Sequence, residues 1–274
     1  MMDRYLVVGN PIEHSLSPVI HAQFAEQTGQ SIEYGRRLVD TADGAFETAI
    51  KAMQEEGISG INVTVPFKEA ACAIADELSP RADKAGAANT LLFRKDGSIY
   101  ADNTDGAGLV ADIRFNHQRD IGGKRILIVG AGGAVRGVVK PLIDERPKSI
   151  TLVNRTRARA VALQELFSED FPLEVCDFDE LQGRQFDIVI NGTSLGLQSK
   201  VAPLPPGLFA DSAMAYDMMY GDGSRPFQQW AKAQGAELAV DGLGMLVGQA
   251  AESFYLWRGT RPDTRPVIES LRAG

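Results

Sequence analysis

Four short polar segments near the start of the chain carry side chains that could do chemistry on a small polar ligand. They are the segments at 14–18 (HSLSP), 62–68 (NVTVPFK), 86–90 (GAANT) and 102–106 (DNTDG). Lys68 and Asp105 each follow directly on a strand-like run, and α/β sheets place their ligands at strand ends. A lysine beside a carboxylate forms a proton-transfer pair, because the carboxylate holds and orients the ammonium group. The hydroxyls and amides around them suit a polyhydroxylated, acidic small molecule.

Each segment alone also has a plain structural explanation. Ser17 could serve only as the N-cap of the helix announced by Ser17-Pro18, and Asn89 could be a turn residue. Lys68 could be a surface charge at a helix start, and Asp105 the cap of the next helix. Their shared position at predicted strand ends favours the functional interpretation.

A glycine-rich turn farther along the chain predicts a nucleotide site. The apolar run at 126–129 (ILIV) leads directly into it, and a helical pattern follows. Small residues let backbone N–H groups approach a pyrophosphate at a helix N-terminus. The residues of this turn are Gly130, Ala131, Gly132, Gly133 and Ala134. Val135 stands where the G-x-G-x-x-G pattern expects a third glycine or alanine, so a turn without a ligand is the alternative.

The end of the next predicted strand favours NADP over NAD. An NAD enzyme carries Asp or Glu there, but this chain has the neutral Asn154 followed by Arg155, Arg157 and Arg159. An acidic residue would repel a 2′-phosphate, whereas a guanidinium binds it with charge-assisted hydrogen bonds. The alternative is that these arginines are only solvated, although cations at a helix N-terminus oppose the helix dipole.

The elements around these motifs predict an α/β protein with two domains. In the N-terminal part, apolar runs at 91–93 and 99–100 flank Asp96-Gly97, a hairpin signal that implies a mixed sheet. From residue 125 onward, six strand-like runs alternate with helical patterns, as in a doubly wound, Rossmann-like domain. The runs lie near 125–129, 150–154, 173–176, 187–190, 214–217 and 237–240.

The tail from Gly242 reads as helical through Leu256 and is expected to pack back on the first domain. The predicted division is therefore a discontinuous substrate-binding domain, 1–106 plus 241–274, and an NADP-binding domain, 107–240.

Composition narrows the choice of partner. The 274 residues include 28 Lys and Arg against 36 Asp and Glu, a net charge of −8, which argues against a nucleic-acid or membrane-surface role. The chain has two cysteines, Cys72 and Cys176, and neither has a metal-ligand spacing. We therefore expect a cytoplasmic protein with reduced thiols and no metal site.

Taken together, the motifs resemble those of the shikimate dehydrogenase family, in order and spacing and over nearly the whole chain. They are Ser15-Leu-Ser17-Pro, Asn62-Val-Thr64-Val-Pro-Phe-Lys68, Asn89-Thr90, Asn103-Thr-Asp105-Gly, Gly130-Ala-Gly-Gly-Ala134, Asn154-Arg155-Thr156, Asn191-Gly-Thr193-Ser194, Tyr216-Asp-Met218-Met-Tyr220 and Asp241-Gly242-Leu-Gly-Met245 through Gln249.

The resemblance implies an oxidoreductase of aromatic amino-acid biosynthesis. It would interconvert 3-dehydroshikimate and shikimate by hydride transfer with NADP, and Lys68 and Asp105 would act as the acid/base pair. The implied substrate-binding residues are Ser15, Ser17, Asn62, Thr64, Asn89, Tyr220 and Gln249. The implied cofactor-binding residues are Gly130, Ala131, Gly132, Gly133, Ala134, Asn154, Arg155, Thr156, Arg159, Thr193, Met218, Gly242 and Met245.

Some features depart from the family pattern or leave alternatives open. Glu13 stands where glycine is usual, which places a negative charge close to the serines, and Gly192 stands where alanine is frequent. A quinate/shikimate dehydrogenase with broader substrate or cofactor use is the nearest alternative. A catalytically silent NADP-binding sensor is the alternative from another class. A monomer and a homodimer are both compatible with the sequence.

Overall fold

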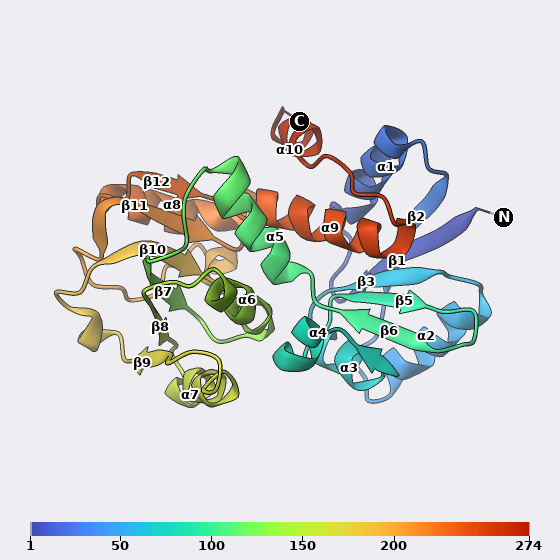
Figure 1. Cartoon of the computed structure of the whole chain (residues 1–274), viewed down its shortest axis with the longest axis horizontal. Coiled ribbons are helices and arrows are strands. Elements are labelled where there is room, and N and C mark those ends of the chain that lie inside the picture. The colour runs from blue at the N-terminus through green and yellow to red at the C-terminus, as the bar shows by residue number, and fades with distance from the viewer. Residues whose placement is uncertain (1, 274) are drawn as a thin grey trace. The chain divides into compact units, whose positions relative to one another are not determined.

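The computed structural model describes residues 2–273 of the 274-residue chain. Over these residues the chain forms two compact units, each built on its own sheet. Unit 1 combines Met1–Gly108 with Val247–Gly274, and unit 2 is Leu109–Leu246. Figure 1 shows the elements of both units, coloured along the chain.

The chain changes units inside two helices. It leaves unit 1 within α5 (Asp105–Ala111) and returns within α9 (Leu243–Arg258). The predicted domain boundaries, after residues 106 and 240, lie near these two helices. Sequence marks boundaries by turn residues, so it does not reveal that a helix continues across them.

Unit 1 contains a mixed sheet. Within residues 2–273 its strand order is β2-β1-β3-β5-β6-β4. The strands are β1 (Asp3–Gly9), β2 (Ile32–Leu38), β3 (Gly60–Val63), β4 (Glu77–Leu78), β5 (Thr90–Phe93) and β6 (Ile99–Asp102). β1 pairs in parallel with β2 and β3, whereas β5 pairs antiparallel with β3 and β6. The predicted hairpin is confirmed, with Phe93 opposite Ile99.

The sequence pattern predicts neither β2 nor β4. β2 is an edge strand, and its sequence, IEYGRRL, mixes charged residues with a glycine instead of alternating cleanly. β4 has only two residues, Glu77 and Leu78. Neither pattern carries enough periodicity to predict a strand.

The helices of unit 1 are α1 (Ser17–Thr28), α2 (Ala45–Glu55), α3 (Lys68–Ala73), α4 (Pro80–Ala85), α10 (Arg265–Ala273) and most of α9. Of these, α2, α3 and α4 contribute buried apolar residues to the core beside the sheet, and α10 packs on α1. On α2, Phe46, Ile50 and Met53 are buried, and Ala49 packs partly buried against the same core, as their helical spacing predicts. The predicted N-cap of α1 is wrong: Leu16 is the N-cap, and Ser17 is the first helical residue.

Unit 2 has the doubly wound topology that the sequence predicts. Among the described residues, its sheet runs in the order β12-β11-β10-β7-β8-β9, and every pair is parallel. The strands are β7 (Arg125–Val129), β8 (Ser149–Val153), β9 (Glu174–Cys176), β10 (Phe186–Asn191), β11 (Phe209–Asp217) and β12 (Leu238–Val240). The order reverses between β7 and β10, where ligands of such sheets bind at the carboxyl ends of the strands.

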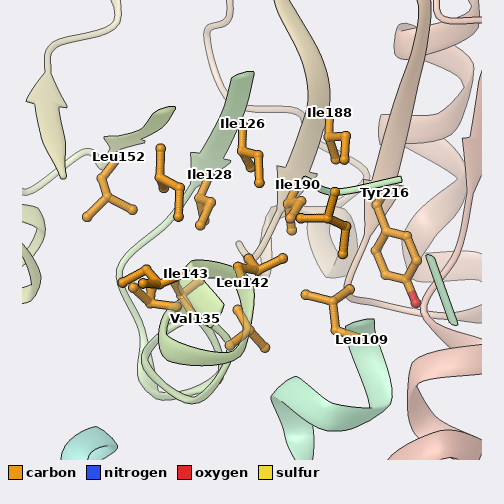
Figure 2. Packing of buried hydrophobic residues seen from close by; sticks show 14 of the residues in the cluster. Leu109, Ile126, Ile128, Val135, Leu142, Ile143, Leu152, Ile188, Ile190 and Tyr216 are labelled. Atoms are coloured by element: carbon orange, nitrogen blue, oxygen red, sulfur yellow. The ribbon is translucent and has the colours of Figure 1, made fainter. Parts of the chain in front are cut away.

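Helices α6 (Gly133–Asp144), α7 (Arg157–Leu166) and α8 (Arg225–Ala233) cover this sheet. Figure 2 shows one face of the core, where Ile126 and Ile128 of β7 and Ile190 of β10 point toward Leu142 of α6. α5 continues into a short π-helix, Asp112–Asn116, which periodicity did not predict. The carboxylate of Asp112 is buried there and accepts hydrogen bonds from Tyr216 Oη at 2.6 Å and Asn116 Nδ2 at 2.7 Å.

Candidate functional site

The structure brings Lys68 and Asp105 into direct contact. Lys68 begins α3 and Asp105 begins α5, and the lysine ammonium donates a hydrogen bond to Asp105 Oδ2. The two side chains are 16% and 6% exposed, so water reaches them only partly. Asp105 Oδ1 accepts a second hydrogen bond from Asn89 Nδ2 at 2.9 Å. The carboxylate is thus fixed on both oxygens and holds the ammonium group in one orientation.

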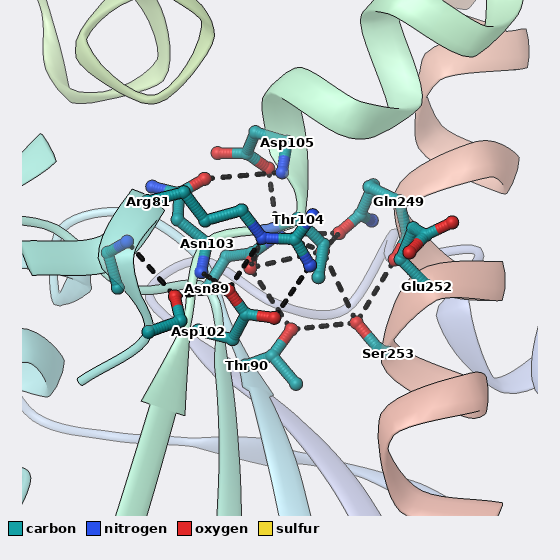
Figure 3. A network of polar contacts seen from close by, with 12 residues as sticks. Arg81, Asn89, Thr90, Asp102, Asn103, Thr104, Asp105, Gln249, Glu252 and Ser253 are labelled. Atoms are coloured by element: carbon teal, nitrogen blue, oxygen red, sulfur yellow. Dashed lines mark hydrogen bonds and ion pairs between the residues drawn. The ribbon is translucent and has the colours of Figure 1, made fainter. Parts of the chain in front are cut away.

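Asn89 is the centre of the polar network around this pair (Figure 3). Its Nδ2 also lies 2.9 Å from Thr104 Oγ1 and 2.8 Å from Gln249 Oε1. Its Oδ1 accepts hydrogen bonds from the Thr104 backbone N–H at 2.8 Å and from Thr90 Oγ1 at 3.0 Å. Asn89 is buried. Its amide therefore ties together side chains from β5, α9 and the turn before α5.

Asn62 extends the network into the interior of unit 1. Its Nδ2 donates to Ser253 Oγ at 2.9 Å and to Thr90 Oγ1 at 3.2 Å. Its Oδ1 accepts from Tyr34 Oη at 2.7 Å. The side chain is buried and its donors and acceptor are all engaged within the protein. We therefore regard Asn62 as a support of the predicted substrate site, one step away from a ligand.

The two serines form a second corner of the candidate site. Ser15 Oγ lies 3.2 Å from Ser17 Oγ and accepts from the Ser17 backbone N–H at 3.3 Å. Because α1 begins at Ser17, with Leu16 as the N-cap, the Ser17 hydroxyl lies on the first turn of the helix, where it faces Ser15. Thr64, at the end of β3, lies against the end of β1, where its backbone N–H donates to the Val8 carbonyl at 2.9 Å.

Glu13, which departs from the family pattern, forms no hydrogen bond with the hydroxyls of Ser15 and Ser17. Its side chain is exposed, and Oε2 accepts from the Ile12 backbone N–H at 3.1 Å. Backbone hydrogen bonds at Glu13 and Ile12 hold the pKa of this carboxyl below its usual value. The Glu13 carboxylate is therefore exposed to solvent and bound to the backbone of its own loop.

Several members of this network carry no sequence motif of their own. Ser253 of α9 and Tyr34 of β2 come from elements far from the polar segments in sequence, so only the fold reveals them. Asp102, by contrast, belongs to the polar segment at 102–106; it ends β6 and accepts hydrogen bonds from Arg81 Nε and Nη2 at 2.7 and 2.6 Å. Burial raises the pKa of Asp102, but the hydrogen bonds and charge of Arg81 outweigh burial and leave it below its usual value. This pair braces the turn that leads to Asp105.

The glycine turn of unit 2 joins β7 to the N-terminus of α6 and leaves space beside its backbone. Gly130 follows β7 with φ +115°, a left-handed conformation that favours glycine, and its N–H donates to the Val153 carbonyl at 2.8 Å. Gly132 is the N-cap of α6 and Gly133 its first residue. Apart from the adjoining residues and the nearby backbone of α6, a Cβ at Gly132 or Gly133 would have no atom of residues 2–273 within 4 Å. The protein itself does not demand glycine there, so the open space suits a ligand that approaches the backbone.

Val135, which departs from the nucleotide-binding pattern, and Gly192, which departs from the family pattern, lie close together behind this turn. A Cβ added to Gly192 would lie 2.2 Å from Cγ2 of Val135. Val135 is fully buried, so the space that an alanine at 192 would need is occupied by the valine. Each departure therefore accommodates the other.

The structure distinguishes the three arginines after β8. Arg157 is ion-paired with Asp177 at 2.6 Å and Glu180 at 3.3 Å, and hydrogen bonding to Glu180 raises its pKa. Arg155 and Arg159 are exposed and form no ion pair with another described residue, so their charges are available to an anion. Asn154 Nδ2 donates to the carbonyl oxygen of Thr156 at 2.8 Å and shapes this loop.

The remaining predicted cofactor residues follow the neighbouring strands of unit 2. Thr193 Oγ1 donates to Asn191 Oδ1 at 2.8 Å at the end of β10, beside β7. Met218 follows β11, and its N–H donates to the Asn191 carbonyl at 2.9 Å. Gly242 N–H donates to the Met219 carbonyl at 2.8 Å. Ala131, Ala134 and Met245 also lie in unit 2.

Two further groups lie at the end of β11 and just after it, Asp217 and Tyr220. Tyr220 lies in unit 2, whereas the other predicted substrate residues lie in unit 1, and burial raises the pKa of its phenol. Asp217 is fully buried, and its Oδ2 has no hydrogen-bond partner in the part of the chain that the structure describes. Burial raises the pKa of Asp217 to about 7.

Within residues 2–273, no helix has both the length and the apolar composition needed to cross a membrane. In the same range, no group of three or more His, Cys, Asp or Glu side chains is arranged to hold a metal ion.

Comparison with known proteins identifies the family. Residues 7–91 match the model of the shikimate dehydrogenase substrate binding domain, and residues 242–272 match that of the shikimate 5′-dehydrogenase C-terminal domain. Residues 110–198 match the model of shikimate / quinate 5-dehydrogenase. A curated relative, shikimate dehydrogenase (NADP(+)) of Alkalilimnicola ehrlichii, is 55% identical over 272 residues, which cover 99% of each chain.

Solved structures agree with this assignment. The shikimate 5-dehydrogenase of Thermus thermophilus, in complex with NADP(H) and shikimate, is 32% identical with a TM-score of 0.84 and covers 99% of both chains. The Ael1 enzyme of Pseudomonas putida is 44% identical with a TM-score of 0.90 and covers 98% of both chains. The predicted fold and family are confirmed: the chain belongs to the shikimate dehydrogenase family.

Proposed function

We propose that this protein is an NADP-dependent shikimate dehydrogenase that reversibly reduces 3-dehydroshikimate to shikimate. The observation that carries the proposal is the Lys68–Asp105 pair, held by Asn89, whose amide is in turn bound to Gln249, in a chain of this family. Unit 1 would bind the substrate and unit 2 the NADP, which follows the predicted division of roles.

Lys68 is the group that we assign to proton transfer. Both oxygens of Asp105 already accept hydrogen bonds, one from Lys68 and one from Asn89. The carboxylate therefore orients the Lys68 ammonium group, which keeps further N–H groups that can donate to a substrate. NADPH, when bound, supplies the hydride that adds to the ketone carbon. The Lys68 ammonium donates a proton to the ketone oxygen, which becomes the hydroxyl of shikimate. In the reverse direction the neutral amine takes that proton back.

Ser15, Ser17 and Thr64 would hold the substrate carboxylate and ring hydroxyls, together with Asn89, Tyr220 and Gln249. Hydroxyl and amide groups suit this ligand because they both donate and accept hydrogen bonds. Asn62 would support this site without contacting the substrate, through its hydrogen bonds to Ser253 and Thr90.

The residues of unit 2 fit NADP. The turn from Gly130 to Ala134 leaves its backbone open at Gly132 and Gly133, where the N-terminus of α6 can face a pyrophosphate. Arg155 and Arg159, unpaired within the described chain, would bind the 2′-phosphate, and Asn154 and Thr156 would line the ribose side. Thr193, Met218, Gly242 and Met245 would complete the cofactor site.

The two alternatives differ in what they predict. A quinate/shikimate dehydrogenase is compatible with the model matched by residues 110–198, but the unpaired arginines favour NADP. A silent NADP-binding sensor would not need the Lys68–Asp105 pair, which is intact. We expect the protein to work in a reducing compartment such as the cytoplasm, because Cys72 and Cys176 form no disulfide within residues 2–273. A monomer and a homodimer are both compatible with this function.

The test is an absorbance assay at 340 nm with purified protein. We expect NADPH oxidation that depends on 3-dehydroshikimate, and NADP reduction that depends on shikimate. Equal kcat/KM for quinate and shikimate, or for NAD and NADP, would favour the broader paralogue. NADPH binding without any absorbance change on adding 3-dehydroshikimate or other keto acids would favour the sensor.

A further inference from the structure

Arg36 lies beside the serine corner, which is formed by Ser15 and Ser17. The sequence motifs assign no role to this arginine. It lies on β2, and its side chain forks onto the Ser15 backbone carbonyl, with Nε at 3.0 Å and Nη2 at 2.5 Å. Two parallel donors from a planar guanidinium fix an acceptor in position and orientation. Arg36 therefore holds the loop that presents the Ser15 and Ser17 hydroxyls.

The positive charge of Arg36 is not neutralised by the protein. Among residues 2–273 it forms no ion pair, whereas its neighbour Arg37 lies 2.6 Å from a carboxylate oxygen of Glu56. Arg81 is likewise paired with Asp102 at 2.6 Å. A guanidinium that is fixed on a backbone carbonyl and lacks a counter-ion can interact with an anion from solution.

The serine corner needs such a charge if it receives a carboxylate. The hydroxyls of Ser15 and Ser17 are neutral, and the nearest loop carboxylate, Glu13, is negative. Lys68 is already paired with Asp105. The charge bound directly to the serine loop is that of Arg36, which lies two residues after Tyr34, a member of the polar network, on the same face of β2.

We propose that Arg36 is a positioning and specificity residue for the substrate carboxylate. It orients the Ser15–Ser17 loop through the Ser15 carbonyl, and its charge attracts the carboxylate that the two hydroxyls receive. The inference rests on the proposed function, since it concerns how that substrate is recognised. It assigns to the edge strand β2 a role in selecting acidic substrates.

The experiment compares the full-length wild type with Arg36→Gln and Arg36→Lys, and uses Arg37→Gln as the matched control. Arg37 is the adjacent residue of the same strand, but its charge is paired with Glu56. Shikimate and its uncharged methyl ester are the two substrates, with NADP in both cases. The ratio of KM for the acid to KM for the ester reports the charge interaction and cancels any general loss of folded enzyme.

For Arg36→Gln we expect KM for shikimate to rise by about five- to thirtyfold, with kcat and KM for NADP within about twofold of wild type. KM for the ester should change far less. Arg36→Lys should recover part of the loss, because the charge stays while the fork is lost. Added salt should raise KM for shikimate in the wild type more than in Arg36→Gln.

Equal effects on the acid and the ester, or an unchanged KM for shikimate in Arg36→Gln, would overturn the inference. The same rise in Arg37→Gln would also overturn it, since it would show a nonspecific effect of surface charge. If the wild type oxidises shikimate with NADP, any of these results leaves the proposed function intact. A wild type that oxidises no shikimate with NADP refutes the proposed function, and this inference with it.

Discussion

Val135 and Gly192 are predicted to depend on each other. The sequence has a valine where the nucleotide-binding pattern expects glycine or alanine, and a glycine where the family often has alanine. In the structure, a methyl group at 192 would lie 2.2 Å from Cγ2 of Val135 and 3.2 Å from Sδ of Met218. Ordinary carbon contacts are about 3.5–4.0 Å, so the overlap with Val135 exceeds about 1 Å.

The magnitude follows from this overlap. Gly192→Ala should lower the free energy of unfolding by about 1–3 kcal/mol, the usual cost of overpacking a dense core. Val135→Ala removes two buried methyl groups and should cost about 2 kcal/mol. In the double variant the new methyl occupies space that the valine vacated. Its cost should therefore fall about 1–2 kcal/mol below the sum of the single variants.

Urea unfolding of the four proteins measures this cycle, with hydrogen exchange of β7 and β10 peptides to assign the loss to unit 2. Gly132→Ala is the matched control, because a Cβ at Gly132 would contact no described residue other than its neighbours in the chain. Its stability should stay within about 0.5 kcal/mol of wild type, while its affinity for NADP should fall. Strictly additive single costs, or a Gly192→Ala cost below about 0.5 kcal/mol, would refute the coupling.

Three further predictions test separate parts of the site. Arg155→Ala should weaken NADP binding by about 1.5–3 kcal/mol without affecting NAD, whereas Arg157→Ala, which removes an ion-paired guanidinium, should have a smaller effect; calorimetric titration with both cofactors distinguishes the two. Lys68→Ala should fold normally and lose roughly 10²–10⁴ in kcat, and a retained kcat would exclude it as the proton donor. Asp217 has its pKa raised to about 7 by burial, so its contribution to stability is present below about pH 4 and is lost as the pH rises through 7. Asp217→Asn should therefore gain about 2–3 kcal/mol relative to wild type between pH 5 and pH 8 in urea unfolding, and parallel pH curves would contradict this.

The parts of the fold that sequence predicts best are those set by local patterns. The six strands of unit 2 are short apolar runs separated by helical periodicity, and the sequence places each within a few residues, except that β11 begins earlier, at Phe209. The hairpin at Asp96-Gly97 depends on one turn and is also predicted correctly. The edge strand β2 is not predicted, because its charged residues and glycine interrupt the alternation of apolar and polar side chains that is typical of a strand.

The site is only partly accessible from sequence, because its geometry depends on distant elements. Lys68 and Asp105 are paired on chemical grounds alone, and the structure places them in contact. Ser253 and Tyr34 have no motif, since only the docking of α9 and β2 gives them polar partners. Sequence also does not separate Arg157 from its neighbour Arg155, because the carboxylates that pair with Arg157 come from another segment.

The most direct test of the proposed reaction is transfer of deuterium from labelled NADPH. The protein is incubated with 3-dehydroshikimate and NADPH that carries deuterium on one face of nicotinamide C4, each face in turn, and the product is analysed by mass spectrometry. We predict that shikimate will carry one deuterium on the new carbinol carbon when one of the two labelled forms of NADPH is used, and none when the other is used. Lys68→Ala should form no such product on the same time scale. NADPH consumption without deuterated shikimate, or deuterated shikimate formed equally fast by Lys68→Ala, would contradict the proposed reaction or the assigned proton donor, respectively.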